Sequence, residues 1–238
     1  GWNPRYEKKD FWTAFEPFIA VLRQAGVKRI TGDLVADATW LRQPPQGAGW
    51  AVGDLQDYYG AEISAISLEE NYVDLHITPA KVVGQPCVAE FKQPLSGLMI
   101  DNRTVTTPAG SPRRLQVLRL PGENRVLLQG ELPLDGKVEE NEATMERPAE
   151  WFARALHEAL KRAGITVEGR AIGVRWPEAP RTGAVRIGEI KSAPLRDIVA
   201  TINKPSQNLK TDLIFGYLGE LDRAADTPAW RQSEELAV

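Results

Sequence analysis

Two segments that share one pattern, an amphipathic helix followed by a glycine and a short strand, constrain the fold of this chain most. Residues 10–25 carry apolar side chains at helical spacing and stop at Gly26. Residues 148–163 repeat the arrangement and stop at Gly164. The pair predicts two halves of one α/β layer that meet in space, with roughly 110 intervening residues looped out. A chance similarity of two helix–strand segments is the alternative.

The stretch between these segments is mostly of β type. Residues 62–68 and 72–78 place apolar side chains at alternate positions, as half-buried strands do. Residues 115–120 and 125–132 are two further expected strands, and the Pro-Gly-Glu-Asn sequence at 121–124 between them is typical of a hairpin turn. We therefore expect a small β domain inside the α/β layer.

The last part of the chain alternates helices with polar breaks. Residues 177–183 are rich in proline and glycine and are expected to form a linker. A helix is expected over residues 195–203, capped by Ser192, and a polar break follows at 203–208. The helix after the break is expected to end at Gly219 and to place on one face Leu209, Leu213, Ile214 and Leu218.

Charge and composition argue against several kinds of function. The net charge is −3 and basic residues are scattered, so nucleic acid is not an expected partner. No apolar run reaches the ~20 residues that span a bilayer. Cys87 is the only cysteine, so it can form no internal disulfide and is expected to be a buried, inert thiol. His76 and His157 lie far apart without ligand-spaced partners, so we expect no metal site and no cofactor.

Residues 206–208, Ser-Gln-Asn, are the motif that points to chemistry. They lie in the break between two expected helices, where a hydroxyl and a carboxamide two residues apart can both face one cleft. The pair suits acyl transfer from an amide, because a hydroxyl can relay a proton to a leaving amine while a carboxamide holds the substrate's peptide group. By itself the tripeptide is a weak signal, since Ser-x-Asn often marks only a turn.

Three stretches of the chain match one family in the same order. They are residues 30–37 (ITGDLVAD), the run over residues 49–71 that contains GW, GDL, YYGA, SAIS and EN, and residues 191–219, which contain KSAPLRDI, NKPSQNL and GYLG. Over nearly the whole chain this resembles the low-molecular-mass class C penicillin-binding proteins. These are the D-Ala-D-Ala carboxypeptidase/endopeptidases of the penicillin-binding protein 4 type.

The resemblance implies an active site of three elements, Ser-x-x-Lys, Ser-x-Asn and Lys-Thr-Gly or His-Thr-Gly. No serine of this chain is followed by a lysine three residues later, and Arg181-Thr182-Gly183 precedes the Ser-x-Asn element and is interpreted as linker. In the family the first element lies upstream of this stretch and the third downstream. Both ends of the chain are therefore expected to be truncations. The C-terminal end would lie within a helix expected from about Ala229. The chain alone is expected to be inactive.

The expected fold class is mixed α/β (α+β). The resemblance assigns residues 1–75 and 146–183 to an inserted α/β domain, residues 76–145 to a nested small β domain, and residues 184–238 to part of a penicillin-binding (serine β-lactamase-like) transpeptidase domain.

The resemblance also implies roles for five residues. Ser206 would pass a proton to the departing D-alanine, Asn208 would hydrogen-bond the substrate backbone, and Lys204 would be a supporting charge. Asp54 and Tyr59 match positions that line the pocket for the free end of the peptide stem, where a carboxylate suits an ammonium group. The alternatives are a turn residue for Asp54 and an aromatic in a core strand for Tyr59.

The intact parent is thus expected to be a periplasmic or otherwise extracytoplasmic serine peptidase. It would act on peptidoglycan stem peptides through an acyl-enzyme and be acylated by β-lactams. One alternative is a relative without catalysis that binds the cell wall or acts as a scaffold, and another is an inserted domain with its own partner. The sequence carries no signal for an oligomeric state.

Overall fold

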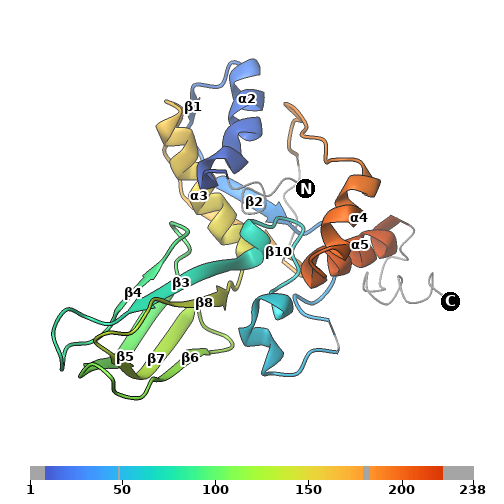
Figure 1. Ribbon diagram of the computed structural model, residues 1–238. Coiled ribbons are helices and arrows are strands. Elements are labelled where there is room, and N and C mark those ends of the chain that lie inside the picture. Colours follow the sequence, from blue (N-terminus) through green and yellow to red (C-terminus); the bar gives the residue numbers. More distant parts are fainter. Residues whose placement is uncertain (1–8, 48, 179–182, 222–238) are drawn as a thin grey trace. The chain divides into compact units, whose positions relative to one another are not determined.

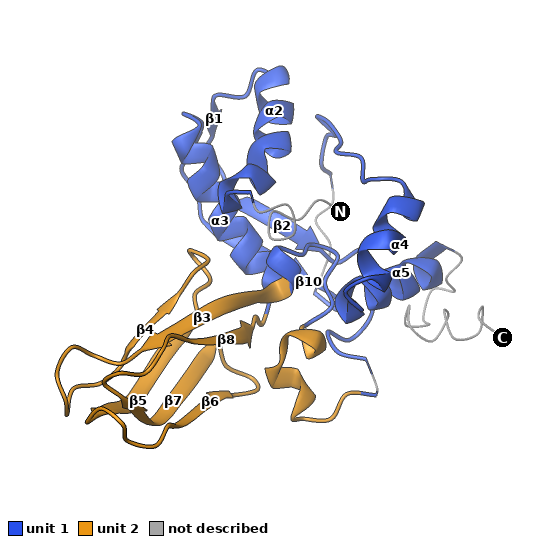
Figure 2. Ribbon diagram, in the orientation of Figure 1, with its two compact units in different colours: residues 1–49, 62–70, 147–238 blue, residues 50–61, 71–146 orange. Residues whose placement is uncertain are grey.

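A computed structural model describes residues 9–47, 49–178 and 183–221 of the chain (Figure 1). The chain divides into two compact units, coloured separately in Figure 2. Unit 1 comprises residues 1–49, 62–70 and 147–238, and unit 2 comprises residues 50–61 and 71–146. The expected mixed α/β fold class is confirmed, whereas the expected domain boundaries stay predictions.

Unit 1 is built around two pairs of parallel strands. Its first segment contains the 3-10 helix η1 (Phe11–Phe15), α2 (Glu16–Gln24), β1 (Arg29–Ile30) and β2 (Leu34–Ala38), and its second contains α3 (Pro148–Arg162), β9 (Thr166–Val167) and β10 (Ala171–Arg175). Strand β1 pairs with β9, and β2 pairs with β10 over five residues. The predicted meeting of the two helix–glycine–strand segments is therefore confirmed.

Glycines and aromatic side chains explain how each helix ends and how the two helices meet. Gly26 and Gly164 adopt φ values of 72° and 80°, the left-handed backbone that ends many helices. The ring of Phe15, which is fully buried, lies 5.5 Å from that of Phe152, and the ring of Phe18 lies 5.2 Å from it. Such aromatic pairs stabilise helix contacts beyond the area that they bury.

Unit 2 contains two three-stranded sheets. In one, β3 (Tyr72–Thr78) lies between β4 (Val88–Phe91) and β8 (Glu139–Thr144), antiparallel to both. In the other, β7 (Arg125–Pro133) lies between β5 (Met99–Thr107), which is parallel to it, and β6 (Arg114–Arg119), which is antiparallel. The predicted strand at 72–78 and the predicted hairpin are confirmed. The core of this unit includes Val73, Leu75, Ile77, Val126, Leu128 and Leu132.

Residues 62–68 form no strand, so that prediction was wrong. Serine side chains there form hydrogen bonds with nearby backbone groups, which would otherwise be free to bond a neighbouring strand. The Ser67 hydroxyl donates to the Ser64 carbonyl at 2.9 Å, and the Ile66 N–H donates to the Ser64 hydroxyl at 3.3 Å. The alternation of apolar residues thus belongs to an irregular, largely buried segment.

The two expected C-terminal helices are confirmed as α4 (Leu195–Asn203) and α5 (Asn208–Leu221). The expected cap was wrong, because α4 begins after Pro194 without a side-chain bond, and the Ser192 hydroxyl donates to the Ala193 carbonyl. Helix α5 runs two residues past Gly219, and Leu218 is exposed. The helix expected from Ala229 lies outside the described residues.

Strand β10 approaches helix α3 so closely that a side chain has no room between them. A Cβ atom placed on Gly173 would lie 2.3 Å from the backbone nitrogen of Glu150 and 2.7 Å from the carbonyl carbon of Ala149. Both atoms belong to the first turn of α3 and cannot move without shifting the helix. Gly173 therefore sets the spacing between helix and sheet in unit 1.

We predict that Gly173→Ala lowers the free energy of unfolding by about 2–3 kcal/mol, the scale of overpacking against rigid backbone. Gly32→Ala is the matched control, because a Cβ atom there meets nothing within 4 Å, and it should change stability by less than about 0.5 kcal/mol. Urea unfolding followed by tryptophan fluorescence measures both. Equal stability of Gly173→Ala and wild type would contradict this account of the helix–sheet contact.

Candidate active site

The Ser-x-Asn element lies in the break between α4 and α5, where the sequence places it. Ser206 is exposed, with φ at 60°, and Asn208 is the first residue of α5. Between them Gln207 is buried, and its N–H donates to the Ile202 carbonyl at 3.0 Å. A left-handed residue between two helices turns the chain sharply, and the Gln207–Ile202 bond fixes that turn to α4.

Ser206 is exposed to solvent. Within the described ranges, no other residue hydrogen-bonds its hydroxyl. Lys204 is exposed and is the C-cap of α4, where a positive charge interacts favourably with the helix dipole. Lys204 and Ser206 thus lie in the break and Asn208 begins the next helix, and the roles expected for these three residues stay predictions.

Apolar packing holds α5 against the irregular segments of unit 1. Leu209 is buried in a cluster with Leu41 and Ile63, and Leu213 packs against that cluster. A Cβ atom on Gly216 would lie 2.8 Å from Oε1 of Gln43. The helix therefore fits closely against residues 39–45, which follow strand β2.

Asp54 and Tyr59 belong to unit 2, in two consecutive 3-10 helices, η2 (Asp54–Gln56) and η3 (Tyr58–Gly60). The Asp54 carboxylate accepts a hydrogen bond from the Ala51 N–H at 2.9 Å, so this residue does stabilise a turn. The Tyr59 hydroxyl donates to Asp57 at 2.9 Å and lies 3.4 Å from Asp54 Oδ1. The alternative of a core strand for Tyr59 was wrong, because this residue lies in η3.

The hydrogen bond to Asp57 raises the pKa of Tyr59 to about 12, and the negative charges of Asp57 and Asp54 add to the effect. The phenol therefore stays neutral beside the two carboxylates, with its one O–H donated to Asp57. Such a group of oxygens attracts cationic ligands.

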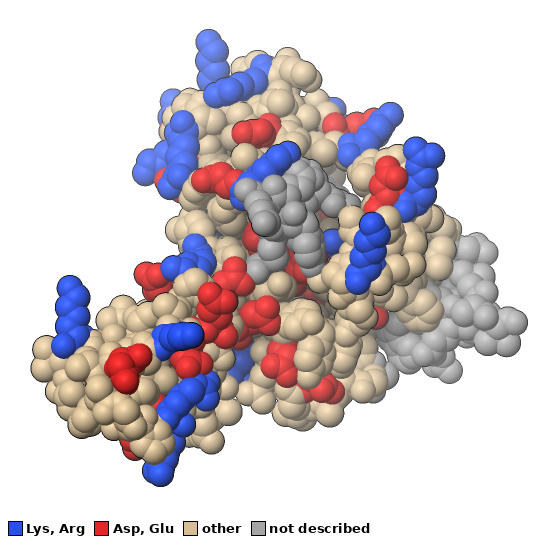
Figure 3. Space-filling model, viewed as in Figure 1, with Lys and Arg blue, Asp and Glu red and all other residues tan. Residues whose placement is uncertain are grey.

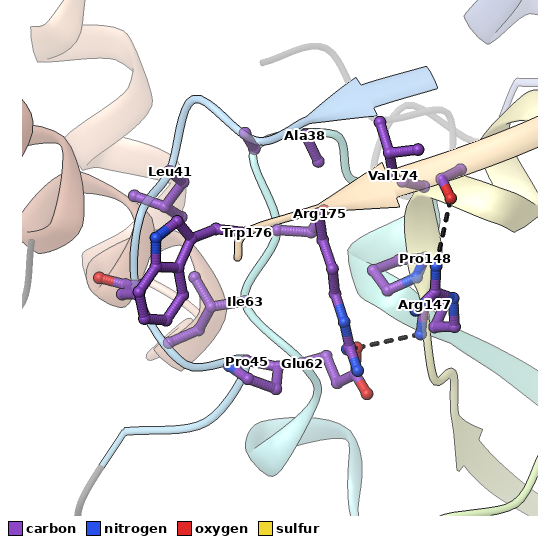
Figure 4. A pocket seen from close by; sticks show the side chains of 15 residues that line it. Ala38, Leu41, Pro45, Glu62, Ile63, Arg147, Pro148, Val174, Arg175 and Trp176 are labelled. Atoms are coloured by element: carbon purple, nitrogen blue, oxygen red, sulfur yellow. Dashed lines mark hydrogen bonds and ion pairs between the residues drawn. The ribbon is translucent and has the colours of Figure 1, made fainter. Parts of the chain in front are cut away.

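Unit 1 also contains a small pocket, and the buried side chain of Glu62 is one of those that line it (Figure 4). The Glu62 carboxylate accepts from the Arg175 guanidinium at 2.9 Å and from the Arg147 N–H at 3.0 Å. Arg147 also donates to the Gly173 carbonyl at 3.2 Å. With a volume of about 20 Å³ the pocket has room for about one water molecule and none for a peptide. These contacts stabilise the unit, and sequence reasoning missed them because Glu62 is 85 residues from Arg147 and 113 from Arg175.

The described part of the chain contains no group of three or more histidine, cysteine, aspartate or glutamate side chains placed to hold a metal ion. It also contains no helix with the length and apolarity needed to cross a membrane.

Comparison with known proteins decides the family. A family model described as D-Ala-D-Ala carboxypeptidase 3 (S13) matches residues 4–235. The chain belongs to the S13 family. The resemblance inferred from the sequence motifs is thereby confirmed.

Curated relatives of this S13 chain carry the same description. A D-alanyl-D-alanine carboxypeptidase of Actinomadura sp. (strain R39) is 28% identical over 214 residues, which cover 87% of this chain and 39% of that protein. The D-alanyl-D-alanine carboxypeptidase DacB of Haemophilus influenzae is 23% identical over 201 residues, covering 83% and 40%. The chain spans about 40% of the length of these relatives.

Solved structures share the fold of the S13 chain. Penicillin-binding protein 4 (dacB) of Haemophilus influenzae matches with a TM-score of 0.73 and 22% identity, over 93% of this chain and 48% of that one. The same protein in complex with a β-lactam matches with a TM-score of 0.66 and 18% identity, over 95% and 47%. At these identities the likeness establishes the fold.

We predict that Ser206→Gly raises the free energy of unfolding by about 1 kcal/mol, because glycine adopts the left-handed backbone at little cost. Ser192→Gly is the control, since the backbone of that exposed serine is not left-handed, and it should not stabilise the chain. Thermal and urea unfolding measure both changes. A Ser206→Gly variant less stable than wild type would mean that the serine side chain holds the break.

We also predict that Asp57→Asn lowers the pKa of Tyr59 from about 12 toward the ordinary value near 10. Removing the charged acceptor removes the interaction that favours the protonated phenol. The measurement is a titration of phenolate absorbance. The titration of wild type minus that of Tyr59→Phe gives the pKa of Tyr59, and the titration of Asp57→Asn minus that of Asp57→Asn/Tyr59→Phe gives its value in the variant. An unchanged difference titration after Asp57→Asn would show that Asp57 does not control this phenol.

Proposed function

We propose that this chain forms part of a serine D-Ala-D-Ala carboxypeptidase/endopeptidase that cleaves peptidoglycan stem peptides outside the cytoplasmic membrane. One observation carries the proposal. A Ser-x-Asn element lies in a sharp break between two helices, in a chain that matches the S13 family from residue 4 to residue 235. In this proposal residues 184–238 belong to the transpeptidase domain, and residues 1–183 form the inserted α/β domain with its nested β domain.

The nucleophile in this mechanism is a serine outside residues 1–238, because no serine here is followed by a lysine three residues later. Its oxygen attacks the carbonyl carbon of the penultimate D-alanine, and an ester bond forms as the amide bond breaks. The leaving amine takes up a proton through the hydroxyl of Ser206, a residue exposed in the break. Water then hydrolyses the ester and releases the shortened peptide.

Asn208 and Lys204 position the substrate in this scheme. The Asn208 carboxamide can both donate to a peptide carbonyl and accept from a peptide N–H, which fixes the scissile amide relative to the nucleophile. The exposed ammonium group of Lys204 adds positive charge near the carbonyl oxygen that becomes negative in the transition state. β-Lactams present the same amide in a strained ring, so they acylate the same serine.

Asp54 and Tyr59 are proposed to hold the free end of the stem peptide. The pKa of Tyr59 is about 12, so its phenol stays neutral at physiological pH. A carboxylate next to this phenol suits an ammonium group such as that of diaminopimelate. Asp54 uses one oxygen to bind the Ala51 N–H, so the oxygen that faces Tyr59 is the one assigned to the ligand.

Ser206→Ala and Asn208→Ala should each slow acylation of the full-length protein by about 10²–10³-fold, the scale of losing one preorganised polar group. Labelling with a fluorescent penicillin measures the rate. Ser192→Ala is the matched control, because Ser192 is an exposed serine before α4. The full-length protein with this substitution should be acylated at the wild-type rate.

Three outcomes would contradict the proposal. Acylation of both site variants within about threefold of wild type would remove Ser206 and Asn208 from the mechanism. Covalent labelling of residues 1–238 alone would show that the nucleophile lies within this chain. Full-length wild type that binds cell wall but is never acylated would favour a non-catalytic role.

A further inference from the structure

Two glutamates bind the helix that carries Asn208 to the rest of unit 1. The first is Glu220, in the last turn of α5, whose side chain is only 1% exposed. One of its oxygens accepts from the backbone N–H of Arg42 at 2.7 Å. The other accepts from Nε and Nη2 of the Arg42 guanidinium at 3.1 and 2.8 Å. Several charge-assisted bonds to one residue fix geometry as well as adding energy.

The second glutamate is Glu70, which binds the first turn of the same helix. The Lys210 ammonium lies 3.1 Å from Oε1 of Glu70, and the two side chains are 14% and 4% exposed. Lys210 follows Asn208 by two residues. Removing one member of a buried ion pair is strongly unfavourable, so this pair links the segment that ends at Glu70 to the first turn of α5.

The backbone that presents Glu70 is itself unusual. Glu69, Glu70 and Asn71 have φ values of 49°, 59° and 60°, and all three residues are buried. A run of left-handed residues without glycine is unfavourable and persists only where the surrounding structure requires it. The run places the Glu70 carboxylate against Lys210.

The charges on α5 oppose the helix dipole. A lysine in the first turn and a glutamate in the last turn are both on the unfavourable ends. Helix stability therefore does not explain either residue, whereas the partners Glu70 and Arg42 do. The two pairs lie about 15 Å apart along the helix, so together they fix its position and its rotation about its axis.

We propose that Glu70 and Arg42, through Lys210 and Glu220, are positioning residues for the Ser-x-Asn element. They hold α5 so that Ser206 and Asn208 keep the geometry needed for acylation. The inference rests on the proposed function, and it assigns a part in catalysis to segments 39–45 and 62–70, which carry none of the reacting groups.

The test uses the full-length protein with the variants Glu70→Gln, Glu220→Gln and Arg42→Lys. Each keeps the size or the charge of the side chain, so the fold should be retained. We expect each variant to lower the limiting acylation rate by about tenfold while the apparent affinity for penicillin changes less than about threefold. Glu90→Gln, at an exposed pair with Lys92, is the matched control and should leave both parameters unchanged.

The second measurement is hydrogen exchange of the Gln207 backbone amide. This amide donates to the Ile202 carbonyl in the break between α4 and α5, so its exchange rate reports how often that bond opens. We expect this amide to exchange about tenfold faster in Glu70→Gln and Glu220→Gln, with no change in Glu90→Gln. Glu70→Gln and Lys210→Met remove the same ion pair. The double variant should therefore be acylated no more slowly than the slower of the two single variants.

Unchanged limiting rates together with unchanged Gln207 exchange would overturn the proposal. A lower melting temperature with normal acylation would also overturn it, because that result describes a structural contact only. If wild type is never acylated, the proposed function fails, and exchange of Gln207 still decides whether the two pairs position the break.

Discussion

The parallel pairing of β2 with β10 is the constraint on which the rest of unit 1 depends. It joins residues 137 positions apart, as in the bond between Arg170 and Asp33 beside it, and it closes the long loop that contains unit 2. Closing so long a loop costs conformational entropy that local contacts do not return. The aromatic contacts of Phe15 in η1 and of Phe18 in α2 with Phe152 in α3 help to offset that cost. Pairing of β2 with β10 also positions the segment that follows β2, and α5 packs against that segment.

Periodicity and glycine positions were enough to predict the frame of this molecule. The two helices, their glycine ends, the hairpin of β6 and β7, and the helix–break–helix around Ser206 all depend on local preferences that a sequence states directly. Strand β8 was missed because Glu139 to Thr144 is almost wholly polar, and only pairing with β3 makes it a strand. The segment 62–68 was misread for the opposite reason, since its apolar alternation is real but Ser64 and Ser67 bind the local backbone.

The candidate site was predictable only as far as its motif reaches. Ser206, Gln207 and Asn208 are adjacent, so their type and spacing suggested the chemistry, and the resemblance to one family narrowed it. The contacts of Glu70 with Lys210 and of Glu220 with Arg42 join residues 140 and 178 positions apart, and nothing in a single sequence pairs them. The left-handed backbone of Ser206, Glu69 and Glu70 was equally invisible, because serine and glutamate carry no local signal for it.

The orientation of charge along α5 has a consequence for how portable this site is. End charges that oppose the helix dipole weaken a helix that is already short, so we expect an isolated helix–turn–helix peptide with this motif to be largely unfolded. Any transplant would have to bring the acceptor segments from far away in the chain. Substitutions in those segments and in α5 are therefore expected to affect one another, because the Arg42 guanidinium and the Glu220 carboxylate bind each other directly.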